Sequence, residues 1–286
     1  LADSTHWVAA LAGIANAVGA ETGVLAPVAA EVTDTARAVA KSLLGGESKA
    51  ILLGNAAAHH AQASSLLSLA NWIAQQTGAT VGYLTEAANT VGAQLVQAQP
   101  GQGGLNAGQM LSGALKAAIL HNTEPAFDSA SGSAGLKSAG MVVTLSPFKA
   151  NLDISDVLLP IAPFTETSGS FVNAEGRLQS FHAVVRPLGD TRPGWKVLRV
   201  LGNLLGLPGF DADSSQAVLA AALPGVTAGQ VVDASRLSNA GSAFIDMNVI
   251  PGQPCVASIY QLDSLVRRAS SLQLTADARS TEGALA

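Results

Sequence analysis

Short apolar runs alternate with stretches of helical periodicity between residues 49 and 160. Runs that are apolar throughout indicate strands buried on both faces, which is typical of a parallel sheet covered by helices. A helical stretch follows the first run, with Leu66, Leu67, Ala70 and Ile73 on one face and Gly78 at its end. The runs span residues 50–54, 80–84, 117–120, 141–145 and 156–159, and Pro160 closes the last of them. The pattern predicts an α/β fold with a doubly wound, mostly parallel sheet.

The pattern changes after Ile161. Residues 171–173 and 177–179 flank a short turn-forming segment, which predicts a β-hairpin. Two helices are expected beyond it, one from Pro193 to Gly206 and one over residues 215–223, followed by a small irregular C-terminal region. We therefore expect an α/β domain over residues 1–210 and a helix and strand extension over residues 211–286.

The apolar stretch over residues 7–20 is expected to form a buried helix, because it is shorter than the roughly 20 residues that span a bilayer. The chain begins at Leu1 without a basic leader segment. We interpret this start as a cut inside a longer protein, with proteolytic maturation as the alternative.

The amino-acid composition excludes several classes of protein. The 286 residues include 15 Lys and Arg against 20 Asp and Glu, a net charge of −5, and 48% of the residues are hydrophobic. This balance excludes a disordered chain and argues against a nucleic-acid-binding protein. The single cysteine, Cys255, excludes an internal disulfide framework and a self-contained iron–sulfur cluster or four-cysteine zinc site.

Charged residues make up only 12% of the chain, and Glu86 is the one charge between Ile51 and Leu115. A free-standing domain normally displays many charges over such a length. Two interpretations remain open: other subunits cover this surface, or the composition is biased towards small residues.

Two strand ends are the candidate ligand-binding positions. Gly54 and Asn55 follow the first apolar run, and His121 and Asn122 follow the third. Ligands of open α/β sheets bind beyond the carboxyl ends of the strands, although ordinary turn residues also occupy such positions. The glycine-rich segment 101–104 follows Pro100 instead of a strand, which favours a flexible loop over a phosphate-binding loop.

Other polar residues do not form a convincing catalytic or metal-binding set. His59 and His60 are adjacent, so on a helix their side chains would diverge by about 100°, and a role at a helix start is favoured. Glu166 and Glu175 could be paired acid/base carboxylates, but an ion pair of either with Arg177 in the turn is the favoured interpretation. We expect no catalytic residue and no metal ligand in this chain.

An ordered block of motifs resembles the molybdopterin oxidoreductase superfamily. It consists of a Ser-Asp-Val-Leu-Leu-Pro strand, a Thr-Glu element, an Asn-Ala-Glu-Gly-Arg turn and an Arg-Pro-Gly-Trp helix start. The upstream segment 119–125 also matches a strand-turn-proline element of that superfamily. The residues that carry the resemblance, expected to be structural, are Asp156, Pro160, Glu166, Asn173, Glu175, Gly176 and Arg177.

Within that superfamily, residues 49–209 are most similar to the large iron–sulfur subunit of the proton-pumping NADH:quinone oxidoreductase, respiratory complex I. The resemblance implies a peripheral-arm position on the cytoplasmic face of the bacterial inner membrane, with the other arm subunits as partners. It implies that the iron–sulfur clusters belong to an N-terminal part absent from this sequence. It further implies a degenerate pterin-type domain without a cofactor or redox centre of its own, inside an enzyme that oxidises NADH.

The alternative is the C-terminal half of an active molybdenum or tungsten bis-pterin oxidoreductase, such as a formate dehydrogenase. In that case the strand-end residues would bind the guanosine phosphates of the pterin, and a metal ligand would lie upstream of Leu1.

Overall fold

A computed structural model describes residues 2–85, 87–113, 115–129, 131–233, 235, 237–241, 244–248 and 258–282. Contacts divide the chain into two compact units, Leu1–Ala88 with Ala234–Val256, and Asn89–Asp233 with Ala257–Ala286. Glu86 and Cys255 lie outside the described residues. The domain boundary expected near residue 210 lies inside the second unit and stays a prediction.

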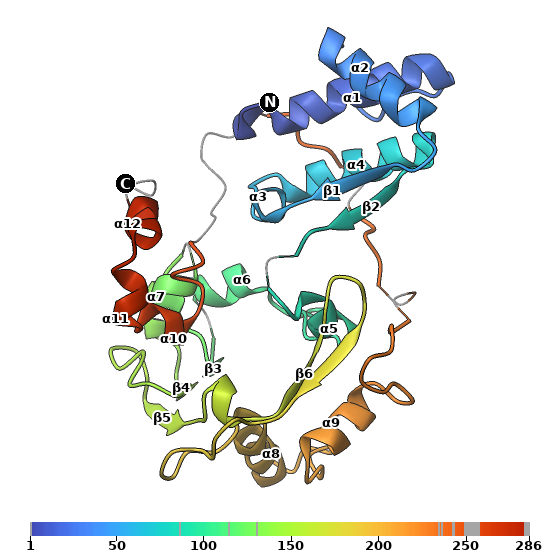
Figure 1. The fold of residues 1–286 in the computed structure, drawn as a ribbon. Helices are drawn as coiled ribbons and strands as arrows, with labels where there is room; N and C mark the ends of the chain where they lie inside the picture. Colours follow the sequence, from blue (N-terminus) through green and yellow to red (C-terminus); the bar gives the residue numbers. More distant parts are fainter. Residues whose placement is uncertain are drawn as a thin grey trace. The chain divides into compact units, whose positions relative to one another are not determined.

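Among its described residues, the first unit has two parallel strands and four α-helices (Figure 1). Strand β1 pairs with β2 in parallel, with Ala50 opposite Thr80 and Leu53 opposite Tyr83. Helix α4 packs against both strands and against α1, and α2 packs on α1. In chain order the elements are η1 (Ser4–His6), α1 (Trp7–Thr22), α2 (Asp34–Gly45), β1 (Ala50–Leu53), α3 (Asn55–Ala58), α4 (Ala63–Thr77) and β2 (Thr80–Tyr83).

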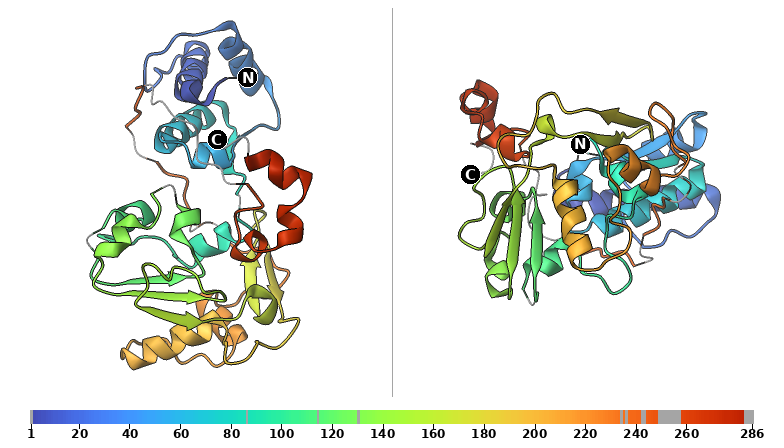
Figure 2. Two further views of the ribbon diagram at one scale, coloured as in Figure 1. Left: turned by 90° about the vertical axis from the view of Figure 1, so that its left-hand side faces the viewer. Right: turned by 90° about the horizontal axis from the view of Figure 1, so that it is seen from below.

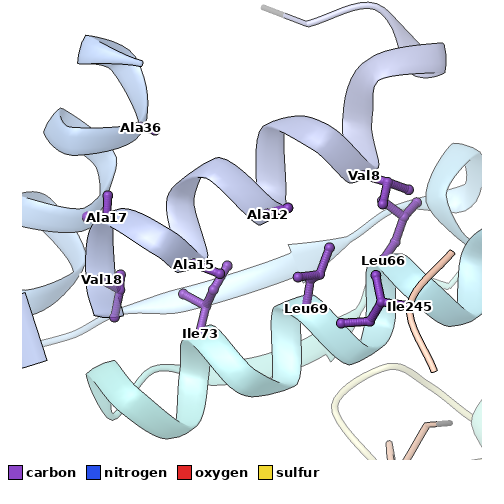
Figure 3. Close-up of a cluster of buried hydrophobic side chains, with 11 residues drawn as sticks. Val8, Ala12, Ala15, Ala17, Val18, Ala36, Leu66, Leu69, Ile73 and Ile245 are labelled. Carbon is purple, nitrogen blue, oxygen red and sulfur yellow. The ribbon is translucent and has the colours of Figure 1, made fainter. Parts of the chain in front are cut away.

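Small residues of α1 let it approach α4 closely. Figure 3 shows Ala12 and Ala15 of α1 facing Leu69 and Ile73 of α4, all in one cluster of buried side chains. Ala12 and Leu69 are fully buried, so the larger side chains of α4 fill the space that the alanines leave. The burial of this face confirms the buried helix expected over residues 7–20.

The second unit contains a three-stranded parallel sheet and a β-hairpin. Strands β3, β4 and β5 pair in sequence order and lie side by side (green in Figure 2). Strands β6 and β7 pair antiparallel, with Val172 opposite Leu178. The elements are α5 (Thr90–Leu95), α6 (Ala107–Leu111), β3 (Ala118–His121), α7 (Pro125–Asp128), η2 (Ala134–Ser138), β4 (Val142–Ser146), β5 (Val157–Pro160), η3 (Phe164–Glu166), β6 (Gly169–Val172), β7 (Leu178–Phe181), α8 (Gly194–Leu204), α9 (Ser215–Ala222), α10 (Ser264–Arg267), α11 (Ser270–Gln273) and α12 (Ala276–Glu282).

The predicted α/β class with mostly parallel strands is confirmed, as are the five apolar strands and the hairpin. The parallel strands form one sheet in each unit. Helix α5 lies in a glycine- and glutamine-rich segment where the sequence predicts no helix. Its apolar face is short and buries little besides Leu95, so the segment has no clear helical periodicity. None of the described helices is long and apolar enough to cross a membrane.

Candidate functional site

An apolar cavity of about 350 Å³ lies beside the carboxyl end of β1. Gly54 precedes the four-residue helix α3, and Asn55 is the first residue of that helix. The cavity is lined by Gly54 together with side chains of α1, β1, α3 and α4, namely Trp7, Ala10, Leu11, Ile14, Leu52, Leu53, Ala56, Ala57 and Leu66. No charged side chain is among these described lining residues, so the cavity suits apolar groups better than phosphates.

At the carboxyl end of β3, His121 lies against the backbone of α8. Its Nε2 occupies the space where a side chain at Gly194 would begin, so this close approach requires glycine. Desolvation by burial lowers the pKa of His121 below its ordinary value, which favours a neutral imidazole. Asn122 follows in the left-handed conformation, with φ 51°, and its backbone N–H donates a hydrogen bond to Leu145 O at 2.8 Å.

The carboxylate of Glu124 follows His121 and Asn122 along the chain. Glu124 is buried, and its Oε1 and Oε2 accept from the two terminal nitrogens of Arg268 at 2.7 and 3.0 Å. The Arg268 guanidinium lies over the Phe148 ring, with 4.4 Å from Cζ to the centroid. The hydrogen bond to Glu124 raises the pKa of Arg268, so the guanidinium remains charged.

Helix α7 and the segment around α10 extend this ion-pair network. Nη2 of Arg267 donates to Asp128 Oδ1 at 2.6 Å, and Asp128 Oδ2 accepts from the Glu124 amide at 2.6 Å. The carboxylates lie just beyond β3 and the arginines near the C-terminal end of the described chain. Sequence reasoning missed this network, since no local pattern signals a pair that is 144 residues apart.

The Asn-Ala-Glu-Gly-Arg motif forms the turn of the hairpin. Asn173 Oδ1 accepts from the amides of Glu175 at 3.0 Å and Arg177 at 2.9 Å. Gly176 adopts φ +81°, which confirms the positive φ that the turn chemistry predicts. Glu175 Oε2 lies 3.8 Å from Arg177 Nε, which is the ion pair favoured from the sequence. Arg177 Nη1 donates a hydrogen bond to Gly229 O at 2.9 Å.

The remaining motif residues also contact the backbone. Asp156 Oδ2 accepts from the Val142 amide at 2.7 Å, which fixes the first residue of β4. Pro160 is the last residue of β5 and pairs with Ser146. Glu166 Oε2 accepts from the Leu188 amide at 2.9 Å. Each contact joins segments of the fold, and none of them brings two carboxylates together.

His59 is exposed and directly follows the last residue of α3, whereas His60 lies in the turn before α4. His60 is buried, stacks on Trp7, contacts Ser4 O at 3.0 Å through Nε2 and accepts from the Gln62 amide through Nδ1. Both of its ring nitrogens are therefore engaged with backbone groups. Across the described residues, His, Asp and Glu side chains form no group of three that could hold a metal ion.

The sequence pattern of the family described as molybdopterin oxidoreductase matches residues 15–204, well over half of the chain. The chain belongs to the molybdopterin oxidoreductase family. The match includes β1 to β7 and all of α8, so the two strand ends and the hairpin turn are parts of the family fold.

Among curated proteins, the chain is similar to Staphylococcus aureus proteins with the provisional name formate dehydrogenase. The identity is 42% over 52 residues with the protein of strain USA300, and 40% over 52 residues with that of the bovine strain RF122. Each match covers 18% of this chain and 5% of the relative, so only a small fraction of either protein is compared.

Molybdopterin cofactors of the dinucleotide type carry phosphates, which bind where backbone N–H groups or cations converge. The apolar cavity beside Gly54 has no cationic side chain among its described lining residues. Beyond β3, the two arginines nearest the strand end are already paired, Arg268 with Glu124 and Arg267 with Asp128, and desolvation lowers the pKa of His121. The described residues at both strand ends therefore do not fit the phosphates of a pterin nucleotide.

Proposed function

We propose that this chain is a structural portion of the large iron–sulfur subunit of a proton-translocating NADH:quinone oxidoreductase. It would contribute a pterin-type domain without a redox centre of its own to the electron-input arm. One observation carries the proposal: a molybdopterin oxidoreductase fold in which one strand end borders an apolar cavity and the other has arginines already paired with carboxylates. The motif block from Ser155 to Trp195 supports it, because it resembles that subunit.

In this role the residues of the chain stabilise the fold and take no part in electron transfer. Glu124 and Arg268 tie the C-terminal segment to the end of β3, and Asn173 holds the hairpin turn. The stretch 51–115, whose one charge is Glu86, would lie against neighbouring arm subunits. The enzyme would stand at the cytoplasmic face of the bacterial inner membrane, with its clusters in other parts of the subunit.

The second candidate is an active molybdenum or tungsten bis-pterin oxidoreductase, which the provisional names of the Staphylococcus aureus relatives favour. The two candidates differ in metal content. We expect elemental analysis of the purified full-length protein to show iron and only traces of molybdenum and tungsten. Either metal at about one atom per protein would reverse the ranking.

A pair of variants provides a second test that spares the fold. Asn122→Gly removes the strand-end side chain and keeps a residue that tolerates φ 51°, and Asn55→Ala removes the other strand-end amide. We expect NADH:quinone turnover per assembled complex to stay within twofold of wild type. Loss of a bound pterin, measured by the fluorescence of its oxidised form, would contradict the proposal.

A further inference from the structure

A polar groove of about 540 Å³ lies in the second unit, between the hairpin segment and the starts of α8 and α9. Its volume is in the range of small-molecule sites, roughly 300–1,000 Å³. The groove includes three cationic side chains, Arg186, Arg192 and Lys196, and the two carboxylates Glu166 and Asp213. It does not include the strand ends discussed above.

The cations of this groove are not neutralised by the carboxylates beside them. Asp213 is already paired with Arg199, at 2.9 Å. Among the described contacts, Arg192 donates from Nη1 to Thr191 O, and Lys196 Nζ lies 5.3 Å from the centre of the Trp195 ring. Arg186 makes no ion pair with any described residue. The groove therefore keeps an excess of positive charge.

A buried donor without a partner lies in the same wall. Nε1 of Trp195 is buried and finds no hydrogen-bond acceptor among the described residues, although Trp195 lines the groove. An indole N–H is a donor only, and leaving it without an acceptor in a buried position is unfavourable. An acceptor supplied by a ligand would remove this cost.

Hydroxyl groups complete the lining. The Ser168 and Ser215 hydroxyl oxygens lie 2.7 Å apart, and Ser215 is the first residue of the eight-residue helix α9. Hydroxyls and the positive end of a helix both favour an anionic oxygen. Guanidinium groups bind phosphoryl oxygens in a planar, bidentate manner, as they also bind carboxylates.

We propose that this groove binds a small phosphorylated molecule, through Arg186, Arg192, Lys196 and the Trp195 indole N–H. The proposal does not depend on the role assigned to the chain above. The limited volume of about 540 Å³ favours a small oligoanion over the acidic segment of a protein, which would need a longer surface.

The test measures binding of inorganic pyrophosphate to the purified full chain by isothermal titration calorimetry, at constant ionic strength set with chloride. We expect Arg186→Ala and Arg192→Ala to weaken binding about tenfold each, because each removes a charge-assisted contact. Trp195→Phe keeps the ring and removes the donor, and it should weaken binding several-fold. Glu166→Gln keeps an acceptor for the Leu188 amide and removes a negative charge, so it should tighten binding.

Lys137→Ala is the matched control, because Lys137 is an exposed cation of the same unit that does not line the groove. It should leave the affinity unchanged, and circular dichroism should confirm that all variants fold. Absence of pyrophosphate binding would overturn the proposal, as would an equal loss in Lys137→Ala and Arg186→Ala. Binding of a polyglutamate peptide in place of pyrophosphate would also overturn it.

Discussion

Replacing Gly176 by valine tests the hairpin turn directly. Gly176 has φ +81°, a region in which a side chain beyond glycine costs about 1–2 kcal/mol, and a β-branched residue is worst placed there. Two backbone hydrogen bonds hold this conformation: the Gly176 amide donates to Asn173 O at 2.9 Å, and the Val232 amide donates to Gly176 O at 2.7 Å. The turn cannot relax to a negative φ without losing them.

The strain arises from the backbone and not from crowding at Cβ. A Cβ at Gly176 would lie 3.6 Å from Val231 Cγ1 and 3.6 Å from Val232 O, both ordinary van der Waals distances. We therefore expect Gly176→Val to lower the free energy of unfolding by about 2 kcal/mol. Gly176→Asn should cost less than half of that, because asparagine tolerates the left-handed region.

Equilibrium urea unfolding, followed by circular dichroism, measures these differences as shifts of the transition midpoint. Gly45→Ala is the control, since Gly45 ends α2, lacks a positive φ and has open space around a Cβ. It should be neutral or slightly stabilising. Equal stabilities of the valine and asparagine variants would refute the argument from φ. Normal assembly with turnover reduced a hundredfold would instead make Glu175 and Arg177 catalytic candidates.

Three further predictions concern the second unit. Glu124→Gln should destabilise it by about 2 kcal/mol in urea, because Arg268 would lose a charged bidentate partner. Gly202→Ala should cost about 1–3 kcal/mol, because its Cβ would overlap the Phe210 ring. Burial lowers the pKa of His121 in the folded protein, so as the pH falls the imidazole is protonated first in the unfolded chain. The free energy of unfolding should therefore decrease from about pH 7 to pH 5.5. This decrease should be smaller in His121→Asn.

Each of these predictions has its own control. The exposed Glu47, replaced by glutamine, should leave the urea midpoint unchanged; an equal effect of the two glutamate changes would count against the ion pair. Phe210→Leu should restore part of the stability that Gly202→Ala removes, and strict additivity of the two changes would contradict the overlap. Identical pH profiles for wild type and His121→Asn would remove His121 as the cause of the acid sensitivity.

The sequence by itself determined the local elements. The five apolar runs became parallel strands because each run is short, apolar on both faces and bounded by turn residues. The hairpin followed from the Asn-Ala-Glu-Gly-Arg turn, whose side-chain and glycine requirements are local. The family block was also readable, since its motifs are continuous segments in a fixed order.

Tertiary structure decided how these elements combine. The strands separate into one parallel sheet in each unit, and no local pattern states which strands pair. His121 was visible as a strand-end residue, but only the tertiary structure shows its approach to Gly194 and the burial that lowers its pKa. The Glu124–Arg268 pair joins positions 144 residues apart. Such contacts depend on the three-dimensional path of the whole chain, because burial and electrostatics act through space whereas sequence periodicity reports only neighbours along the chain.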